Sequence, residues 1–292
     1  MIVKGDEMKM KMNFIRKIRA LAVSALAVVT AAGLFSCGAG FDTSNKITVV
    51  SREDGSGTRS AFEELFEVET MSGAEVNDKT GLVLTNIEGN VNAIGYVSLG
   101  SLNDSVKAVK INGVLPTAEN VKNGSYEVSR PFNIATKGTV SEVAQDFIDF
   151  ILSDEGQKVV SDNGYVSIES AGAYSGSKPS GNIKIAGSSS VTPVMEKLRE
   201  AYLAINNNAT IEINQTDSSS GMQSTIDGVV DIGMASREIK DSELEKGITG
   251  TQIAIDGIAV IVNTQNTVDS MTKDQVKKIY SGEYTTWADV IG

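Results

Sequence analysis

The sequence predicts an α/β fold with mainly parallel sheets. Three features support this prediction. Short β-branched or apolar runs recur along the chain, each breaks into a Gly- and Ser-rich turn, and a segment with helical spacing follows. Strands that alternate with helices in this way form parallel sheets, whose ligands lie at the carboxyl ends of the strands.

A stretch rich in Ser, Gly and Ala, residues 169–182, divides the elements into two series and is predicted to be a linker. The first series is a strand at 47–50, a helix at 60–66, a loop and helix at 73–87, strands at 94–98 and 106–111, a turn at Asn112-Gly113, an extended segment at 126–134 and a helix at 139–160. The second series has strands at 183–186, 209–214, 230–237 and 251–263. Its four predicted helices are one that begins at about Thr192, one that ends at Gly228, and two at 272–280 and 286–290.

Composition limits the possible functions. The 292 residues are 41% hydrophobic with 28 Gly and 4 Pro, which suits one or two globular domains. His is absent, which excludes Ser–His and Cys–His nucleophiles and histidine metal sites. The single Cys excludes an intrachain disulfide. We expect no metal and no cofactor.

The chain is acidic, with a formal net charge of −11. Beyond residue 37 it holds 20 basic against 35 acidic residues. Nucleic acid is therefore a poor candidate partner. An anion would have to be bound by local donors, since the overall field repels it.

The N-terminus is predicted to be a targeting segment. A basic region ending at Arg19 precedes an apolar run from Ala20 to Phe35, and Cys37 follows a small residue. Residues 1–37 thus resemble a bacterial lipoprotein signal peptide, with Cys37 as the lipidated first residue of the mature protein and residues 38–44 as a tether. An uncleaved anchor helix is the alternative, although the run is short for a membrane span.

Three loops share one design, in which a strand runs into a hydroxyl-rich turn and a helix begins. They comprise Ser56–Thr58, Ser188–Ser190 and Ser218–Gly221. Each loop alone is more often a helix cap than a binding site. Three together favour a single small oxyanion, bound by helix N-termini and by the guanidinium of Arg52. No P-loop pattern is present, so a nucleotide is not expected.

Asp231 is the acidic residue that this hypothesis must explain. A capping or turn role is at least as common for such an aspartate. A carboxylate only accepts hydrogen bonds, however, so it would bind a protonated phosphate oxygen and repel fully ionised sulfate. Asp231 is therefore predicted to select phosphate.

The four segments IAGSSSVTP, TDSSSGM, VDIGMASRE and VVSREDGSGTR resemble those of the phosphate-binding proteins of bacterial ABC phosphate importers. The resemblance implies a two-lobed type II periplasmic-binding-protein fold with a hinge. It also implies an aspartate paired with the binding arginine, a role that falls on Asp54, while Ser236 and Arg237 are expected only near the site. The implied phosphate ligands are Ser189, Ser190, Ser219 or Ser220, Asp231, Arg52, Ser56, Gly57 and Thr58.

The order of these segments differs from that of the family, because the SREDGSGTR half comes first. A circular permutation explains this order, with the old termini joined by residues 169–182. One lobe would then comprise residues 45–130 plus 263–292 and the other residues 131–262, with hinge crossovers near 130–135 and 260–263. A truncated remnant of a tandem gene is the alternative.

The sequence thus predicts a monomeric, lipid-anchored, extracytoplasmic receptor, at the outer face of the plasma membrane or in a periplasm. It would bind inorganic phosphate and deliver it to ABC permease subunits, without being an enzyme. The alternatives are a receptor for sulfate, molybdate or tungstate, a hydrolase using Ser56 or Ser189, and a scaffold lipoprotein that binds no oxyanion.

Overall fold

The computed structural model describes residues 40–291. The predicted signal peptide and Cys37 lie outside the described residues. Within 40–291, no helix combines the length and the apolar character needed to cross a membrane.

The first series of elements surrounds three parallel strands and runs up to residue 122. Its members are β1 (Thr48–Arg52), α2 (Gly57–Phe66), β2 (Glu75–Asn77), α3 (Thr80–Gly89), β3 (Ala93–Ser98), the 3-10 turn η1 (Leu99–Ser101), β4 (Val106–Ala108), β5 (Lys110–Ile111) and α4 (Ala118–Lys122). Three further elements at the end of the chain pack onto this part: β11 (Ser270–Met271), α10 (Lys273–Ser281) and α11 (Trp287–Ile291).

The second part is a continuous stretch of chain. It comprises β6 (Ser129–Lys137), α5 (Glu142–Leu152), α6 (Asp154–Asp162), β7 (Gly181–Ser188), α7 (Thr192–Ile205), β8 (Ala209–Thr216), α8 (Ser218–Ile226), β9 (Ile232–Ala235), α9 (Asp241–Leu244) and β10 (Ile248–Asn263).

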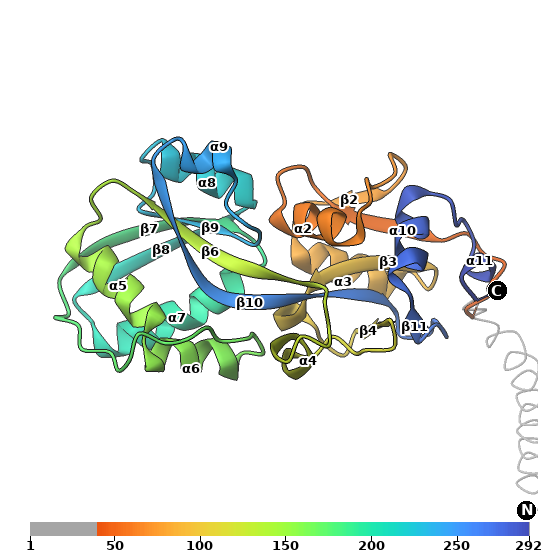
Figure 1. The fold of residues 1–292 in the computed structure, drawn as a ribbon, viewed down its shortest axis with the longest axis horizontal. Coiled ribbons are helices and arrows are strands. Elements are labelled where there is room, and N and C mark those ends of the chain that lie inside the picture. Colours follow the sequence, from red (N-terminus) through yellow and green to blue (C-terminus); the bar gives the residue numbers. More distant parts are fainter. Residues whose placement is uncertain (1–39, 292) are drawn as a thin grey trace, which may run out of the picture. The chain divides into compact units, whose positions relative to one another are not determined.

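In the described part of the chain, one sheet has the order β2-β1-β3-β10-β6-β9-β7-β8, with β4 also paired to β10. The strands β2, β1 and β3 are parallel to one another, as are β8, β7 and β9. The long strand β10 runs antiparallel to β3 and to β6, and so connects the two parallel groups (Figure 1). The predicted α/β class with mainly parallel sheets is confirmed.

Each group of strands has its own hydrophobic core. Phe62, Tyr96, Tyr280 and Trp287 are fully buried in the core around β1 and β3. Phe147 and other apolar side chains of α5 to α7 fill the core beside β7. Apolar burial on this scale is what holds each group together.

The helix predicted at residues 139–160 is two helices in the structure. Ser153 ends α5 by donating to the Phe150 carbonyl at 2.7 Å, and it caps α6 by accepting from Gly156 N at 3.2 Å. Gly156 permits the break, because a Cβ there would lie 2.1 Å from the Phe150 carbonyl oxygen. The strand β2, which is short, largely exposed and at the edge of the sheet, was not predicted from the sequence.

The predicted linker, residues 169–182, is held to the second part of the fold by polar contacts. The buried carboxylate of Asp146 accepts from Tyr174 Oη at 2.6 Å, from Tyr202 Oη at 2.7 Å and from Ser177 N at 3.0 Å. A loop that crosses a folded surface satisfies its polar groups in this way.

The two ends of the described chain lie side by side (Figure 1). Lys46 and Thr286 form an antiparallel bridge, and Ala288 N donates to the Thr43 carbonyl at 2.7 Å. The rings of Phe41 and Trp287 meet edge to face with centroids 5.6 Å apart.

Candidate oxyanion site

The three hydroxyl-rich loops follow β1, β7 and β8, and they meet beside the carboxyl end of β9. β7 and β9 are parallel neighbours, so Ser188 and Ser236 end on the same edge of the sheet. Ser188 Oγ donates to Ser236 Oγ at 2.9 Å, and Ser236 N donates to Ser218 Oγ at 3.1 Å. All three serines are buried, so these hydroxyls are held in fixed positions away from bulk water.

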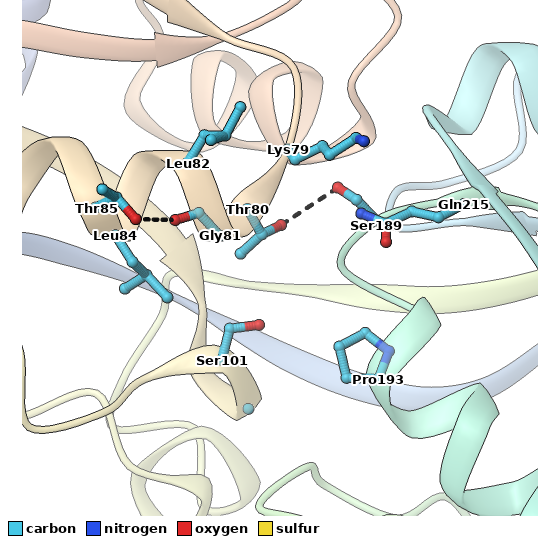
Figure 2. A pocket seen from close by; sticks show the side chains of 11 residues that line it. Lys79, Thr80, Gly81, Leu82, Leu84, Thr85, Ser101, Ser189, Pro193 and Gln215 are labelled. Carbon is cyan, nitrogen blue, oxygen red and sulfur yellow. Dashed lines mark hydrogen bonds between the residues drawn. The ribbon is translucent and has the colours of Figure 1, made fainter.

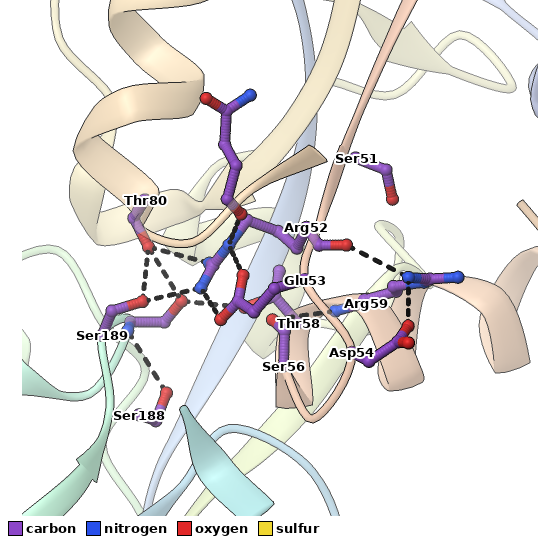
Figure 3. Close-up of polar contacts among 12 residues, drawn as sticks. Ser51, Arg52, Glu53, Asp54, Ser56, Thr58, Arg59, Thr80, Ser188 and Ser189 are labelled. Atoms are coloured by element: carbon purple, nitrogen blue, oxygen red, sulfur yellow. Dashed lines mark hydrogen bonds and ion pairs between the residues drawn. The ribbon is translucent and has the colours of Figure 1, made fainter. Parts of the chain in front are cut away.

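Arg52 provides the positive charge of the site. It is 2% exposed at the end of β1, and Figure 3 shows its guanidinium surrounded by polar side chains. Nε and Nη2 donate to the two carboxylate oxygens of Glu53, each at 2.8 Å. The other edge of the guanidinium faces hydroxyls, with Nη2 2.9 Å from Ser189 Oγ and Nη1 3.2 Å from Thr80 Oγ1. That edge presents a bidentate fork to any oxyanion that displaces the hydroxyls.

The backbone around Arg52 is fixed by a buried tyrosine. Arg52 N donates to Tyr96 Oη at 3.3 Å, and the same hydroxyl lies 2.9 Å from Ser51 Oγ. Burial raises the pKa of Tyr96 to about 12, so this hydroxyl stays neutral at physiological pH.

Hydroxyls from the two parts of the fold are in contact. Thr58 Oγ1 lies 2.8 Å from Ser190 Oγ, and Thr80 Oγ1 lies 3.3 Å from both Ser189 Oγ and Ser190 Oγ. Hydroxyls both donate and accept, so these four side chains can reorient around a bound ion.

The start of α2 approaches the second part closely because residue 57 is glycine. Ser56 caps this helix by accepting from Arg59 N at 3.4 Å. A Cβ on Gly57 would lie 2.4 Å from Ser218 Oγ and 2.8 Å from Ser236 Oγ. Only glycine lets the N–H groups at this helix end reach the serines, and those groups have no partner within the helix.

The structure does not bring both predicted serines of the second loop to the cluster. Ser220 is exposed and bonded to Asp217, which accepts from its N at 2.9 Å and from its Oγ. Ser219 lies at the edge of the site, where its N and Oγ both donate to the Gly55 carbonyl at 3.2 Å. The residue of this loop that reaches the cluster is Ser218, which was not among the predicted ligands.

The placement predicted for Asp231 is wrong. Asp231 precedes β9 and is exposed, and its carboxylate accepts from Lys184 N at 2.8 Å. Because β7 and β9 are parallel, this carboxylate lies at the opposite end of the strand from Ser236. Asp231 lies at the start of β9, so its side chain cannot reach the carboxyl end of that strand. Instead, it accepts a hydrogen bond from the neighbouring strand β7.

Asp54 does not pair with Arg52, contrary to the prediction. Its side chain is 96% exposed and forms an ion pair with Arg59 at 2.6 Å. Glu53 takes the predicted role instead, because its two carboxylate oxygens accept from Arg52 Nε and Nη2.

Ser236 and Arg237, expected only near the site, are both buried in it. Arg237 Nη2 lies 3.3 Å from Ser219 Oγ, and its guanidinium forms two hydrogen bonds to Glu243, at 2.9 and 2.7 Å. Burial would raise the pKa of Glu243, but the hydrogen bonds from Arg237 and from Lys240 N outweigh it and lower that pKa. Each arginine of the site is thus neutralised by its own glutamate.

A cavity of about 520 Å³ opens beside Ser189 and Thr80 (Figure 2). It is lined by α3 and η1 on one side and by Pro193 and Gln215 on the other. In residues 40–291 no group of three or more His, Cys, Asp or Glu side chains could hold a metal ion. The donors of the site, an arginine, hydroxyls and helix N–H groups, suit an anion.

Two groups of parallel strands, with a site built from the strand ends of both groups, are typical of binding proteins that have two α/β halves. The chain belongs to the PBP superfamily, since the model of the PBP superfamily domain matches residues 32–155 and 172–292.

Individual relatives narrow the comparison. The chain is 48% identical to Phosphate-binding protein PstS 2 of Streptococcus agalactiae over 290 residues, which is 94% of this chain and 99% of that protein. It is 43% identical to Phosphate-binding protein PstS of Staphylococcus haemolyticus over 117 residues, 38% of this chain and 37% of that protein. A crystal structure of a phosphate ABC transporter phosphate-binding protein from Streptococcus pneumoniae superposes with a TM-score of 0.68 at 41% identity, covering 84% of this chain and all of the other.

Proposed function

We propose that this protein binds inorganic phosphate between two lobes. The observation that carries the proposal is the buried fork of Arg52, whose Nη1–Nη2 edge faces the hydroxyls of Thr80 and Ser189. Phosphate oxygens replace these neutral acceptors, and an anionic acceptor strengthens the hydrogen bonds from the guanidinium. The proposed ligands from the sequence-predicted set are Arg52, Ser56, Gly57, Thr58, Ser189 and Ser190, with Ser219 at the edge.

The proposed lobes are residues 45–130 plus 263–292 and residues 131–262. The separate hydrophobic cores support this division, and the paired strands β6 and β10, which pass between the groups, would be the hinge. Bound phosphate then favours the closed state because it contacts both lobes there.

We further propose that the protein is lipid-anchored through Cys37 on the extracytoplasmic side and delivers phosphate to ABC permease subunits. The relatives, which are phosphate-binding proteins and a phosphate-binding protein of a phosphate ABC transporter, support this role. The same relatives support a binding protein that is not an enzyme.

The circular permutation is part of the proposal. Its support is the contact between residues 43–47 and 285–288, where an unpermuted chain would run on without interruption. The partial match to the staphylococcal relative also supports it. If the two halves of the sequence are in the opposite order in that relative, a single alignment can match only one of them. The streptococcal relative, matched over 99% of its length, shares the order of this chain.

A second oxyanion such as sulfate is a candidate ligand because of the position of Asp231. The carboxylate that was expected to reject ionised sulfate lies away from the site. Rejection of sulfate therefore cannot depend on Asp231.

The test is calorimetric titration of the purified protein with phosphate and then with sulfate. We expect phosphate binding that Arg52→Ala weakens by at least about 100-fold, because a charged hydrogen-bonding group is lost from a buried site. Arg199→Ala, which removes a surface partner of Glu196, is the control and should bind as the native protein does. Absence of phosphate binding by the folded native protein would refute the proposal.

A further inference from the structure

Thr80 contacts three groups of the proposed site, although nothing in the sequence motifs selected it. It is the first residue of α3 and is 5% exposed. Its Oγ1 lies 3.2 Å from Arg52 Nη1 and 3.3 Å from the hydroxyl oxygens of both Ser189 and Ser190. Thr80 therefore joins the first part of the fold to the serine loop of the second.

Both hydroxyl–hydroxyl contacts of Thr80 are long, because O–H···O hydrogen bonds in proteins are usually about 2.7–2.8 Å, as the neighbouring contact between Thr58 and Ser190 is. The N–H···O contact from Arg52, at 3.2 Å, is at the upper end of the usual range. The Thr80 hydroxyl thus forms only weak bonds while it is buried. It gains a shorter, charge-assisted bond if an anionic oxygen enters between Arg52 and the serines.

The start of α3 adds further donors at the same place. Lys79 occupies the N-cap position and forms no side-chain cap, whereas Ser56 caps α2. The first N–H groups of a helix have no partner within it. Thr80 and Gly81 line the cavity together with Ser189, so the positive end of the α3 dipole borders the space that the ion would enter (Figure 2).

We propose that Thr80 is a direct ligand of the oxyanion, which it reaches from a helix that the recognised motifs do not include. This inference rests on the proposed function and deepens it. The hydroxyl of Thr80 and the Nη1–Nη2 edge of Arg52 bind the ion from the first part of the fold, opposite Ser189 and Ser190.

The experiment compares Thr80→Val, which keeps the shape and removes the hydroxyl, with Thr80→Ser, which keeps the hydroxyl. Thr85→Val is the matched control, because Thr85 also lines the cavity from α3 but its hydroxyl donates only to the Gly81 carbonyl, at 3.2 Å. Phosphate is titrated calorimetrically into each purified protein. We expect Thr80→Val to bind about tenfold more weakly or worse, Thr80→Ser within about threefold of native, and Thr85→Val as native.

A second background separates direct binding from positioning of Arg52. Arg52→Lys removes the fork that contacts Thr80. If Thr80 binds the ion itself, Thr80→Val weakens phosphate binding by a similar factor in this background. If it only orients Arg52, the second substitution adds no further loss, and the inference is wrong.

Folding is checked by urea unfolding of each variant without phosphate, with Thr80→Ala as the substitute if Thr80→Val is unstable. Native-like phosphate affinity in a folded variant without the hydroxyl overturns the inference but leaves the proposed function intact. Failure of the native protein to bind phosphate overturns both.

Discussion

Thr58 and Ser190 lie 132 positions apart in the sequence, yet their hydroxyl oxygens are 2.8 Å apart in the structure. One hydroxyl belongs to the first turn of α2 and the other to the loop before α7. The contact shows how the site is made, since each part of the fold presents hydroxyls and helix ends to the other. A site assembled in this way depends on a few close approaches, which single substitutions can test.

The position of Asp231 leads to the first prediction. Asp231→Asn should leave phosphate affinity unchanged within about twofold, because the exposed carboxylate bonds Lys184 N away from the serine cluster. Calorimetric titration checks this, with Glu53→Gln as the comparison. We expect Glu53→Gln to weaken binding, because Arg52 loses the charged partner that orients it. A marked loss of affinity in Asp231→Asn alone would contradict the structural placement.

Gly57→Ala should weaken phosphate binding and destabilise the fold by about 1–3 kcal/mol, the usual cost of inserting a methyl group into a packed site. The new Cβ would collide with Ser218 Oγ and Ser236 Oγ. Gly89→Ala is the control, because nothing lies within 4 Å of its Cβ position. It should be neutral or stabilising in urea unfolding. Equal behaviour of the two variants would show that the approach at Gly57 is not tight.

The buried pair Arg130–Asp256 links β6 and β10 directly. Arg130 Nη2 lies 3.0 Å from Asp256 Oδ2, and Ser98 Oγ donates to the same carboxylate at 2.9 Å. Burial lowers the pKa of Arg130 and raises the pKa of Asp256, so each charge depends on the other. Asp256→Ala should cost about 3–5 kcal/mol, because it leaves an uncompensated buried cation.

Urea unfolding measures that cost. The double variant Arg130→Met/Asp256→Asn should be less destabilised than the single one, since it removes the lone charge and keeps an acceptor for Ser98. Lys158→Ala breaks an exposed pair with Asp162 and should change stability by less than about 1 kcal/mol. If Asp256→Ala destabilised the protein no more than Lys158→Ala does, the Arg130–Asp256 pair would not have the stabilising role that we assign to it.

Glu243 gives a prediction about pH. Its folded-state pKa is lowered, despite burial, by hydrogen bonds from Arg237 and Lys240 N. A lowered folded pKa means that the ionised group stabilises the fold above the unfolded-state pKa, near 4.3, and that this contribution is lost as the pH falls through the folded pKa. The stability difference between the native protein and Glu243→Gln should therefore be largest near pH 7 and shrink toward pH 3.

Urea midpoints at several pH values measure this difference, with the exposed Glu238→Gln as the control. A gap between the native protein and Glu243→Gln that is constant across pH would contradict the prediction.

The sequence alone determined the class of fold and the three hydroxyl-rich loops. These features are local, because strands, Gly/Ser turns and helix N-termini are each indicated by a short run of consecutive residues. It also placed Arg52 and the serines after β7 at strand ends, where parallel topology brings ligands together. Residues 56–58, 189 and 190 lie in the cluster for that reason.

Only the tertiary structure decided at which end of a strand each polar side chain lies, and with which partner it forms a hydrogen bond or ion pair. Asp231 and Ser236 lie within the same short segment, yet the strand β9 separates them and puts only Ser236 in the site. Arg52 pairs with Glu53 and not with Asp54, because β1 ends at Arg52 and Asp54 lies in the turn that follows, where its exposed carboxylate pairs with Arg59. Thr80 carries no motif at all, and it reaches Ser189 only because the loops of two separate groups of strands converge on the same point.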